Sequence, residues 1–442
     1  MMKGSWLSVL AVAVTVLVPV AALAETEVAV PSTAQAMPER VAGEHDAAGA
    51  AWRMQQLHDW LAAERVEGAQ ETPVIVHFDR EQLRALAGGE CESCSDAKKL
   101  LIGATAEVAV PIDLAGLQPV ALRQHAVRLP HGAVRGMADG GFVWSGVAVS
   151  EGASALRLHI TDFSLPEGSE LYVYNDNGQA FGPYTGEGPL GNGEFWTNTV
   201  AGSRVVLQLR HFGTTSPEAL TRSSFVIADV GHIDPSAFRP AEQATYTTGL
   251  CNFNAECVVD RKCVSSEPSF VDQDLAYAIA HYLFVKKPWI YMCSGGLVAD
   301  LDTSTAIPYF LTANHCLSAS NVASTVEAYF QFWTSACGGA CYDPEGATPR
   351  VLGATLVKTN ATGDYTLLKL NAPAPSGSVF LGWSSTPVAS TNGAMLHRVS
   401  HPQGAPQAYS EHQVDTSAGT CTGWPRGSWI YSRDVVGATE GG

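Results

Sequence analysis

Hydrophobic and polar residues alternate in short runs between positions 120 and 232, which is the pattern of half-buried β-strands. In the clearest run one face is apolar and consists of Leu156, Leu158 and Ile160. The other face of that run is polar and consists of Arg157, His159 and Thr161. A later apolar run ends in Asn175-Asp176-Asn177-Gly178, a tight-turn signal that predicts a hairpin. Short strands with Gly- and Pro-rich turns indicate an antiparallel β-sandwich over 120–232.

The segments on either side of this region have other patterns. Residues 25–50 are rich in Ala, Glu, Pro and Gly without a sustained period, so they are interpreted as a flexible leader. The range 25–119 as a whole is assigned to this leader and the start of a pro-region. Within it, residues 51–64 predict a short amphipathic helix from the spacing of Trp52, Leu57, Trp60 and Leu61. Residues 233–249 form a Pro- and Thr-rich linker, where we expect an activating cleavage because proteolysis concentrates in exposed polar linkers.

Residues 1–24 have the features of a secretory signal peptide. Lys3 provides the positive start, 7–20 the apolar core and Ala22-Leu23-Ala24 the small-x-small cleavage site. A membrane anchor is the alternative, but the core is too short to span comfortably, and no other stretch of about 18 uninterrupted apolar residues occurs. We therefore expect a secreted protein without a membrane partner after signal removal. The remaining length predicts two or three domains.

Charge and cysteine content narrow the class of protein further. The net charge of −17 argues against nucleic acid or an anionic membrane as the partner. Seven of the ten cysteines lie between positions 251 and 341, and behind a signal peptide they are expected mostly as disulfides. Cys91 and Cys94 form a lone C-x-x-C pair. A local disulfide is favoured there over zinc or redox chemistry, because a second ligand pair and a thioredoxin-like context are both absent from the sequence.

Two motifs in the C-terminal half carry candidate chemistry. The apolar run 307–311 ends in Thr312-Ala313-Asn314-His315-Cys316, so a buried strand would deliver one histidine at its end. Further along, Gly363-Asp364 precedes the alternating run 365–370, so a turn would present a carboxylate at the start of another strand. A serine peptidase needs a hydroxyl nucleophile, an imidazole base and a carboxylate behind the imidazole. His315 and Asp364 are the candidates for the last two.

Residues 250–442 resemble the chymotrypsin-fold (trypsin-like) serine endopeptidases, in particular their bacterial lysyl-endopeptidase-like branch. The resemblance rests on the Thr-Ala-x-His-Cys motif at His315 and the Asp-aromatic-Thr-Leu-Leu run at Asp364. It implies an all-β protein in which the sandwich, as a pro- or accessory domain, precedes a protease domain of two β-barrels, the second incomplete. His315 would act as general base and then acid, and Asp364 would orient it. Protein or peptide substrates, a monomer and no metal or organic cofactor are also implied.

The resemblance also implies disulfide partners. Cys293, in a segment similar to the Cys-x-Gly-Ser-Leu strand of the family, would pair with Cys316, and Cys257 would pair with Cys337. Cys251 and Cys421 would have partners beyond the end of this chain. Cys263 and Cys341 are extra to the minimal pattern, and we expect them to pair with each other.

The nucleophile is the component that the sequence does not supply. Residues 435–442 resemble the approach to the Gly-Ser-Ser-Gly-Ser-Pro motif of the family, with Gly442 at the position whose backbone N–H forms half of the oxyanion hole. The serine would then lie about two residues further on, and a truncated zymogen is expected. Ser428 and Ser432 lack the tight Gly turn that exposes a nucleophile.

Other functions remain open at this point. His397 and His401 have the i, i+4 spacing of a zinc pair, but Pro402 disfavours a helix there, so no metal site is predicted. A pseudoprotease or a non-catalytic secreted binding protein is the alternative to an enzyme, and the reading frame after Gly442 distinguishes the first. Substrate specificity is not readable, because in this family the pocket that selects it is built around and after the nucleophile.

Overall fold

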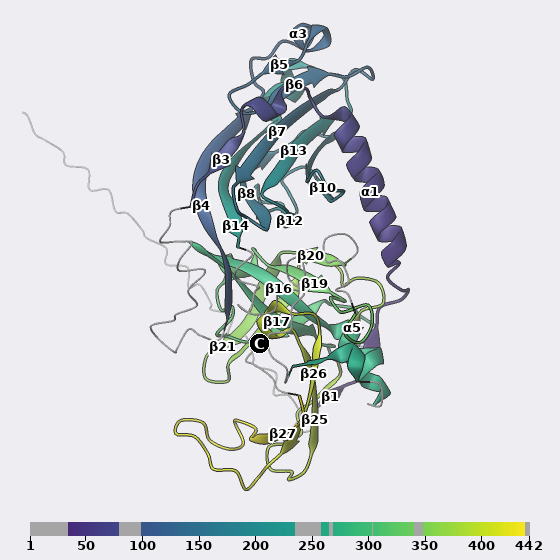
Figure 1. The fold of residues 1–442 in the computed structure, drawn as a ribbon, viewed down its shortest axis with the longest axis vertical. Helices are drawn as coiled ribbons and strands as arrows, with labels where there is room; N and C mark the ends of the chain where they lie inside the picture. Colours follow the sequence, from purple (N-terminus) through teal and green to yellow (C-terminus); the bar gives the residue numbers. More distant parts are fainter. Residues whose placement is uncertain are drawn as a thin grey trace, which may run out of the picture.

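The protein is mostly β and is built from several antiparallel sheets, as the computed structural model shows (Figure 1). The structure describes residues 34–78, 99–234, 258–264, 268–302, 304–339 and 348–437. The signal peptide and nearly all of the linker lie outside the described residues, as do Cys91, Cys94, Cys251, Cys257, Cys341 and Gly442. We call residues 47–234 the N-terminal unit and residues 258–437 the C-terminal unit.

One sheet belongs entirely to the N-terminal unit. Its seven strands are ordered β10-β9-β13-β7-β6-β5, and β3 pairs in parallel with β7. Their bounds are β3 (Val74–Val76), β5 (Val127–Arg128), β6 (Ala133–Gly136), β7 (Phe142–Ser150), β9 (Ser169–Tyr174), β10 (Ala180–Tyr184) and β13 (Arg204–His211). The β9–β10 hairpin turns at residues 175–179, where the sequence predicted it.

A second sheet, of twelve strands, crosses from one unit into the other. Its main path runs β11-β8-β14-β4-β17-β16-β19-β20. The N-terminal unit supplies β4 (Leu100–Asp113), β8 (Ala155–Ser164), β11 (Phe195–Trp196), β12 (Val200–Ala201) and β14 (Ser224–Ile233). The C-terminal unit supplies β16 (Ile279–Lys286), β17 (Trp289–Leu297), β18 (Tyr309–Thr312), β19 (Glu327–Phe330), β20 (Arg350–Leu352), β21 (Ala354–Asn360) and β22 (Tyr365–Leu370). In Figure 1, β4 extends from the upper unit down to β17.

The largest apolar core lies between these two sheets in the N-terminal unit. Leu158 and Ile160 of β8 pack in the same buried cluster as Trp144 of β7 and Leu207 of β13. The alternation predicted for β8 is therefore present. Its polar face is not solvated, however, because Arg157 and His159 are also buried. The C-terminal unit covers that face, as the contacts of Arg157 with this unit show.

Smaller elements complete the two units. The C-terminal unit adds a four-stranded sheet of β15 (Val259–Asp260), β25 (Met395–Ser400), β26 (Ala408–Val414) and β27 (Ser432–Val436). The N-terminal segment lies on the C-terminal unit, where β1 (Gln35–Ala36) pairs with β24 (Trp383–Ser384) and β2 (Glu39–Arg40) with β23 (Val379–Phe380). Short helices are α3 (Pro119–Gln124), α4 (Pro217–Arg222), α5 (Ala276–Ala278) and α6 (Ser320–Ala323).

The long helix α1 (Ala47–Glu64) begins four residues before the predicted start. Asp46 caps it by accepting a hydrogen bond from the Gly49 N–H at 2.8 Å. Leu61 is buried against the seven-stranded sheet, whereas Trp52 is exposed. Among the described residues, every helix is too short or too polar to cross a membrane.

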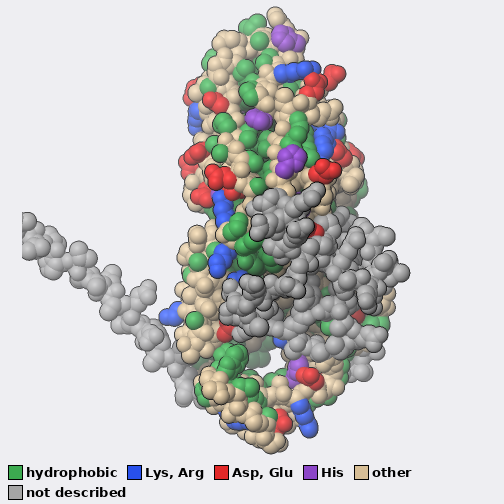
Figure 2. Space-filling view, turned by 60° about the vertical axis from the view of Figure 1, so that its left-hand side comes forward, with side chains coloured by type: hydrophobic (Ala, Val, Ile, Leu, Met, Phe, Trp, Pro, Cys, Tyr) green, Lys and Arg blue, Asp and Glu red, His purple; other side chains and the backbone are tan. Residues whose placement is uncertain are grey.

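The space-filling view shows how charge is distributed over one face. On the N-terminal unit, in the upper half of Figure 2, acidic and basic side chains are interspersed rather than gathered into one patch. A face of mixed charge offers no concentrated positive surface for a polyanion.

Candidate active site

His315 is positioned by the end of a buried strand. Strand β18 lies between β17 and β22, and Phe310 on it is fully buried. The strand ends at Thr312, and a turn that includes Asn314 and His315 follows. Gly295 on β17 permits this close packing, because a Cβ there would lie 2.3 Å from the Phe310 ring. The local sequence therefore brings the imidazole to the edge of a rigid sheet.

Asp364 meets His315 through two hydrogen bonds. The His315 backbone N–H donates to Asp364 Oδ1 at 2.9 Å, and the ring Nδ1 lies 2.7 Å from Oδ2. A carboxylate only accepts, so Nδ1 carries the proton and Nε2 presents its lone pair. Nε2 is buried and has no hydrogen-bond partner among the described residues. This arrangement leaves the imidazole able to take a proton from a hydroxyl placed beside Nε2.

The turn that presents Asp364 is conformationally unusual. Asp364 has φ of 49°, the left-handed region that non-glycine residues seldom adopt, and strand β22 begins at the next residue. The neighbouring turn is fixed as well, because Asn314 Nδ2 donates to Thr359 Oγ1 at 2.7 Å. Backbone strain of this kind persists where surrounding contacts hold it, and it is frequent at functional sites.

A disulfide anchors the turn that carries His315. Cys293 of β17 and Cys316 are bonded, which is the pair implied by the family resemblance, and their Cα atoms are 6.3 Å apart. Both cysteines are buried in the apolar cluster of the C-terminal unit. The residue next to the imidazole is thus tied to the neighbouring strand.

Removing this disulfide is expected to destabilise the C-terminal unit. In the double variant Cys293→Ala, Cys316→Ala, two positions that are 23 residues apart in the sequence are no longer cross-linked in the unfolded chain. The unfolded chain gains conformational entropy, which predicts a loss of about 3 kcal/mol in the free energy of unfolding. Urea denaturation followed by near-ultraviolet circular dichroism measures it. As a control, Cys421→Ala removes a free, exposed thiol and is expected to change the free energy by less than about 0.5 kcal/mol.

The other disulfide prediction was wrong. Cys337 is bonded to Cys263, not to Cys257, so the expected pairing of Cys263 with Cys341 is excluded as well. The two bonded residues are 74 positions apart and their Cα atoms lie 4.4 Å from each other. Asp260, just before Cys263, accepts hydrogen bonds from Thr334 Oγ1 and the Gly338 N–H, which holds the two segments together. That long-range contact is not visible in cysteine spacing.

The remaining sequence candidates do not lie at this site. His397 Nδ1 lies 2.7 Å from Tyr409 Oη, and His401 Nδ1 donates to the Ala405 carbonyl at 2.9 Å. Ser428 and Ser432 are exposed, and neither is a partner of His315 Nε2.

Ligand atoms of Cys293, His315 and Cys316 lie within 4.8 Å of one another, but both sulfurs are in the disulfide and are not available to a metal.

A hollow lies beside the end of β18. Its volume is about 290 Å³, and Thr312 and Ala313 line one side while residues 398–400 of β25 line another. It therefore runs between the strand that leads to His315 and the four-stranded sheet.

Sequence reasoning did not find two buried groups of the C-terminal unit. His281 lies on β16 with its ring 5.1 Å from that of His401, and neither of its ring nitrogens has a hydrogen-bond partner among the described residues. Glu327 lies on β19 and is fully buried. The signal was a polar residue next to apolar ones: His281 is the third residue of β16 and Glu327 is the first residue of β19. Periodicity alone treats such a residue as a surface position.

Two comparisons of the sequence with known proteins agree with the motifs. Residues 248–442 match the profile of a family described as "Lysyl endopeptidase, C-terminal domain". The chain is 25% identical over 354 residues to a lysyl endopeptidase of Pseudomonas aeruginosa, covering 79% of this chain and 71% of that protein. A solved structure, the HtrA-type protease AlgW with decapeptide, is 14% identical, with a TM-score of 0.23, and the match covers 37% of this chain and 50% of that one. The chain thus has a distant similarity to a lysyl endopeptidase.

Proposed function

We propose that this protein is a secreted serine endopeptidase made as a zymogen, in which His315 and Asp364 are two members of a Ser-His-Asp triad. The observation that carries the proposal is the pair of hydrogen bonds from the His315 N–H and Nδ1–H to the two oxygens of Asp364. They hold the ring in the tautomer that a general base needs. The similarity to a lysyl endopeptidase supports the same chemistry.

The mechanism follows from the charges. His315 Nε2 takes the proton of a serine hydroxyl as that oxygen attacks the peptide carbonyl, and Asp364 stabilises the imidazolium that forms. The imidazolium then protonates the leaving amine, and the acyl-enzyme is hydrolysed by the reverse sequence of proton transfers. The proposal needs no metal, and it takes protein or peptide substrates. The specificity for the residue before the cleaved bond is left open.

The same proposal assigns the remaining parts of the chain. Residues 1–24 direct secretion, the N-terminal unit is the pro- or accessory domain, and the linker 233–249 is cut during activation. The C-terminal unit is the protease domain, with its sheets belonging to two β-barrels. The two disulfides found among the described residues are consistent with an extracellular protein.

The test uses the gene product made from its full reading frame. Incubation with casein is expected to give peptide fragments, and a fluorophosphonate probe is expected to label one serine. Replacing His315 with alanine should abolish both, because the hydroxyl loses its base. His397→Ala is the matched control, since that histidine contacts Tyr409 and not Asp364. Hydrolysis that survives His315→Ala would refute the proposal, and absence of any labelled serine in an inactive parent would favour a pseudoprotease.

A further inference from the structure

The N- and C-terminal units are joined by backbone pairing and by a shared apolar cluster. Residues 100–104 of β4 pair with residues 289–292 of β17, so one sheet is continuous across the boundary. Strand β4 thereby covers an edge of β17 that would otherwise present unpaired N–H and C=O groups. The cluster beside this pairing draws on both units: Ile102, Trp196 and Ile233 from one, and Leu283, Val285, Ile290, Met292 and Tyr329 from the other.

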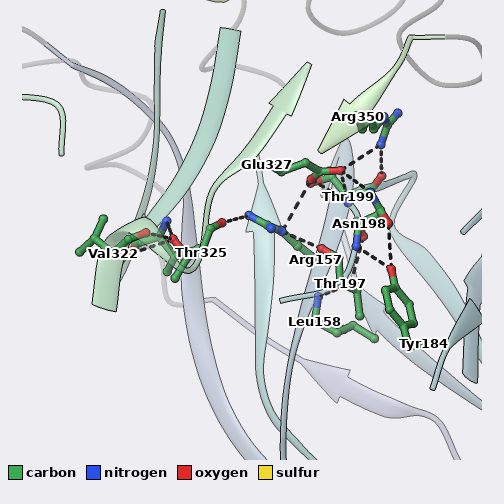
Figure 3. A network of polar contacts seen from close by, with 11 residues as sticks. Arg157, Leu158, Tyr184, Thr197, Asn198, Thr199, Val322, Thr325, Glu327 and Arg350 are labelled. Carbon is green, nitrogen blue, oxygen red and sulfur yellow. Dashed lines mark hydrogen bonds and ion pairs between the residues drawn. The ribbon is translucent and has the colours of Figure 1, made fainter. Parts of the chain in front are cut away.

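A buried charge network crosses the same boundary (Figure 3). Glu327 of the C-terminal unit accepts hydrogen bonds from Thr199 Oγ1 at 2.6 Å, the Thr199 N–H at 3.0 Å and Asn198 Nδ2 at 2.9 Å. Arg157 of the N-terminal unit lies 3.7 Å from the same carboxylate and donates to the Thr325 carbonyl at 2.7 Å. Arg350 lies on the opposite side, 3.4 Å from Glu327. The side chains of Arg157 and Glu327 are 1% and 0% exposed.

The network keeps Glu327 ionised although it is fully buried. Burial by itself would raise the pKa of Glu327, but the charges of Arg157 and Arg350, together with the hydrogen bonds from Thr199 and Asn198, hold this pKa below its usual value. Three of these four partners belong to the N-terminal unit. If the N-terminal unit were removed and no water entered the site, the Glu327 carboxylate would therefore lose most of the charges and hydrogen bonds that offset its burial.

A second charged contact crosses the boundary with the signs exchanged. Here the C-terminal unit supplies the cation, Lys287, whose Nζ lies 2.5 Å from Asp229 of the N-terminal unit. His159, stacked on Trp196, contacts the same carboxylate at 2.6 Å. The C-terminal unit thus presents an anion at one place and a cation at another. A partner must match both signs at the correct separation, which gives the surface specificity.

We propose that the face of the C-terminal unit formed by Lys287, residues 289–292, Glu327 and Arg350 is a dedicated docking surface for residues 34–234 of this chain, with Glu327 as the recognition residue. The two parts then remain one complex when the chain is cut between residues 234 and 258. The pairing of β1 and β2 with β24 and β23 provides a second attachment. This inference does not depend on peptide hydrolysis, so its failure and that of the proposed function are separable.

The experiment cuts the connection and asks whether the parts separate. A recognition sequence for a site-specific protease is placed within residues 241–249 of the full chain, and the purified protein is cut and passed over a size-exclusion column. We expect both fragments to elute together in a one-to-one ratio and at one-copy mass. Separate elution of the two fragments at micromolar concentration, or elution of C-terminal fragments paired with each other, would overturn the proposal.

Variants then test the recognition residue. Glu327→Gln is expected to speed dissociation of the cut complex by about tenfold or more, because Arg157 is left buried without its counter-charge. Glu411→Gln, on β26, is the matched control and should leave the rate unchanged. The double variant Glu327→Gln, Arg157→Met should lose less affinity than the two single losses combined, since it no longer leaves the buried Arg157 guanidinium without its counter-charge. Additive losses, or a Glu327→Gln rate equal to that of the control, would refute the role of Glu327.

Folding of each variant is checked before cutting, by near-ultraviolet circular dichroism of the intact chain. If Glu327→Gln does not fold, Lys287→Met carries the test, because the Lys287 side chain is 52% exposed and its loss leaves the surrounding packing intact. It should raise the dissociation rate about two- to fivefold, and more at low than at high salt. An unchanged rate would count against the docking surface.

Discussion

Replacing Asp364 with asparagine is expected to lower kcat for peptide hydrolysis about 10⁴-fold while leaving the fold intact. Both carboxylate oxygens of Asp364 now accept hydrogen bonds, one from the His315 N–H and one from Nδ1–H. Asparagine has only one accepting oxygen, so its NH₂ group would face either the backbone N–H or the ring. Facing the ring, it would donate to Nδ1 and move the proton to Nε2, where the base is needed.

The measurement is kcat and KM of the full gene product with a peptide substrate, and the free energy of unfolding in parallel. Asp302→Asn serves as control, because Asp302 lies in an exposed turn and contacts Ser304. KM should change little, since Asp364 acts through His315 rather than on substrate. A loss in kcat of less than about tenfold would mean that the carboxylate is structural and that another group orients the imidazole.

Acidification from pH 6.5 to about pH 4.5 is expected to destabilise the C-terminal unit through His281 and His401. Burial lowers the pKa of His401 to about 4, and burial, then the neighbouring His401 and Arg350, lower that of His281. Both imidazoles are therefore neutral in the folded state and protonate more readily when the chain unfolds. The stabilisation that these two neutral imidazoles contribute is complete above about pH 6.5 and decreases as the pH falls. For His401 alone, the loss reaches about 3 kcal/mol when the pH equals the pKa of His401 in the folded state.

The variant His281→Met separates this effect from other titrations. It removes a fully buried imidazole that contacts Tyr329 and Phe332 through ring faces and edges, so the unfolding free energy at pH 7.5 should stay equal or rise. The loss between pH 7.5 and pH 4.5 should be smaller than in the parent. Burial lowers the pKa of His211 and His232 as well, so the comparison is between variant and parent. Exposed His125→Met is the control, and an equal pH dependence in parent and His281→Met would contradict the assignment.

The contact between His315 and Asp364 was predictable from sequence because its signals are local. A strand followed by a turn with His315 and Cys316, and a turn that presents Asp364, each require only a few adjacent residues. The two strands next to these turns, β18 and β22, pair with each other. The hairpin at residues 175–179 and the helix that ends at Glu64 were predictable for the same reason. Each depends on turn chemistry or periodicity within a single segment.

The partner of Cys337 and the surroundings of Arg157 and Glu327 were not predictable. Cysteine spacing allows several pairings, and the one observed depends on how Asp260 brings two distant segments together. For β8, periodicity correctly separated Arg157 from the apolar face, but it could not show that a second unit covers the polar face.

The sequence by itself thus determined which side chains share a face and which residues end a strand, because these follow from the two-residue repeat of a β-strand and from turn preferences. Only the tertiary structure decided what lies against each face. Strand β4 joins β17 across nearly 200 residues of chain, and Glu327 finds its counter-charges in a different unit. Such contacts are chosen by the packing of whole sheets, so no local pattern records them.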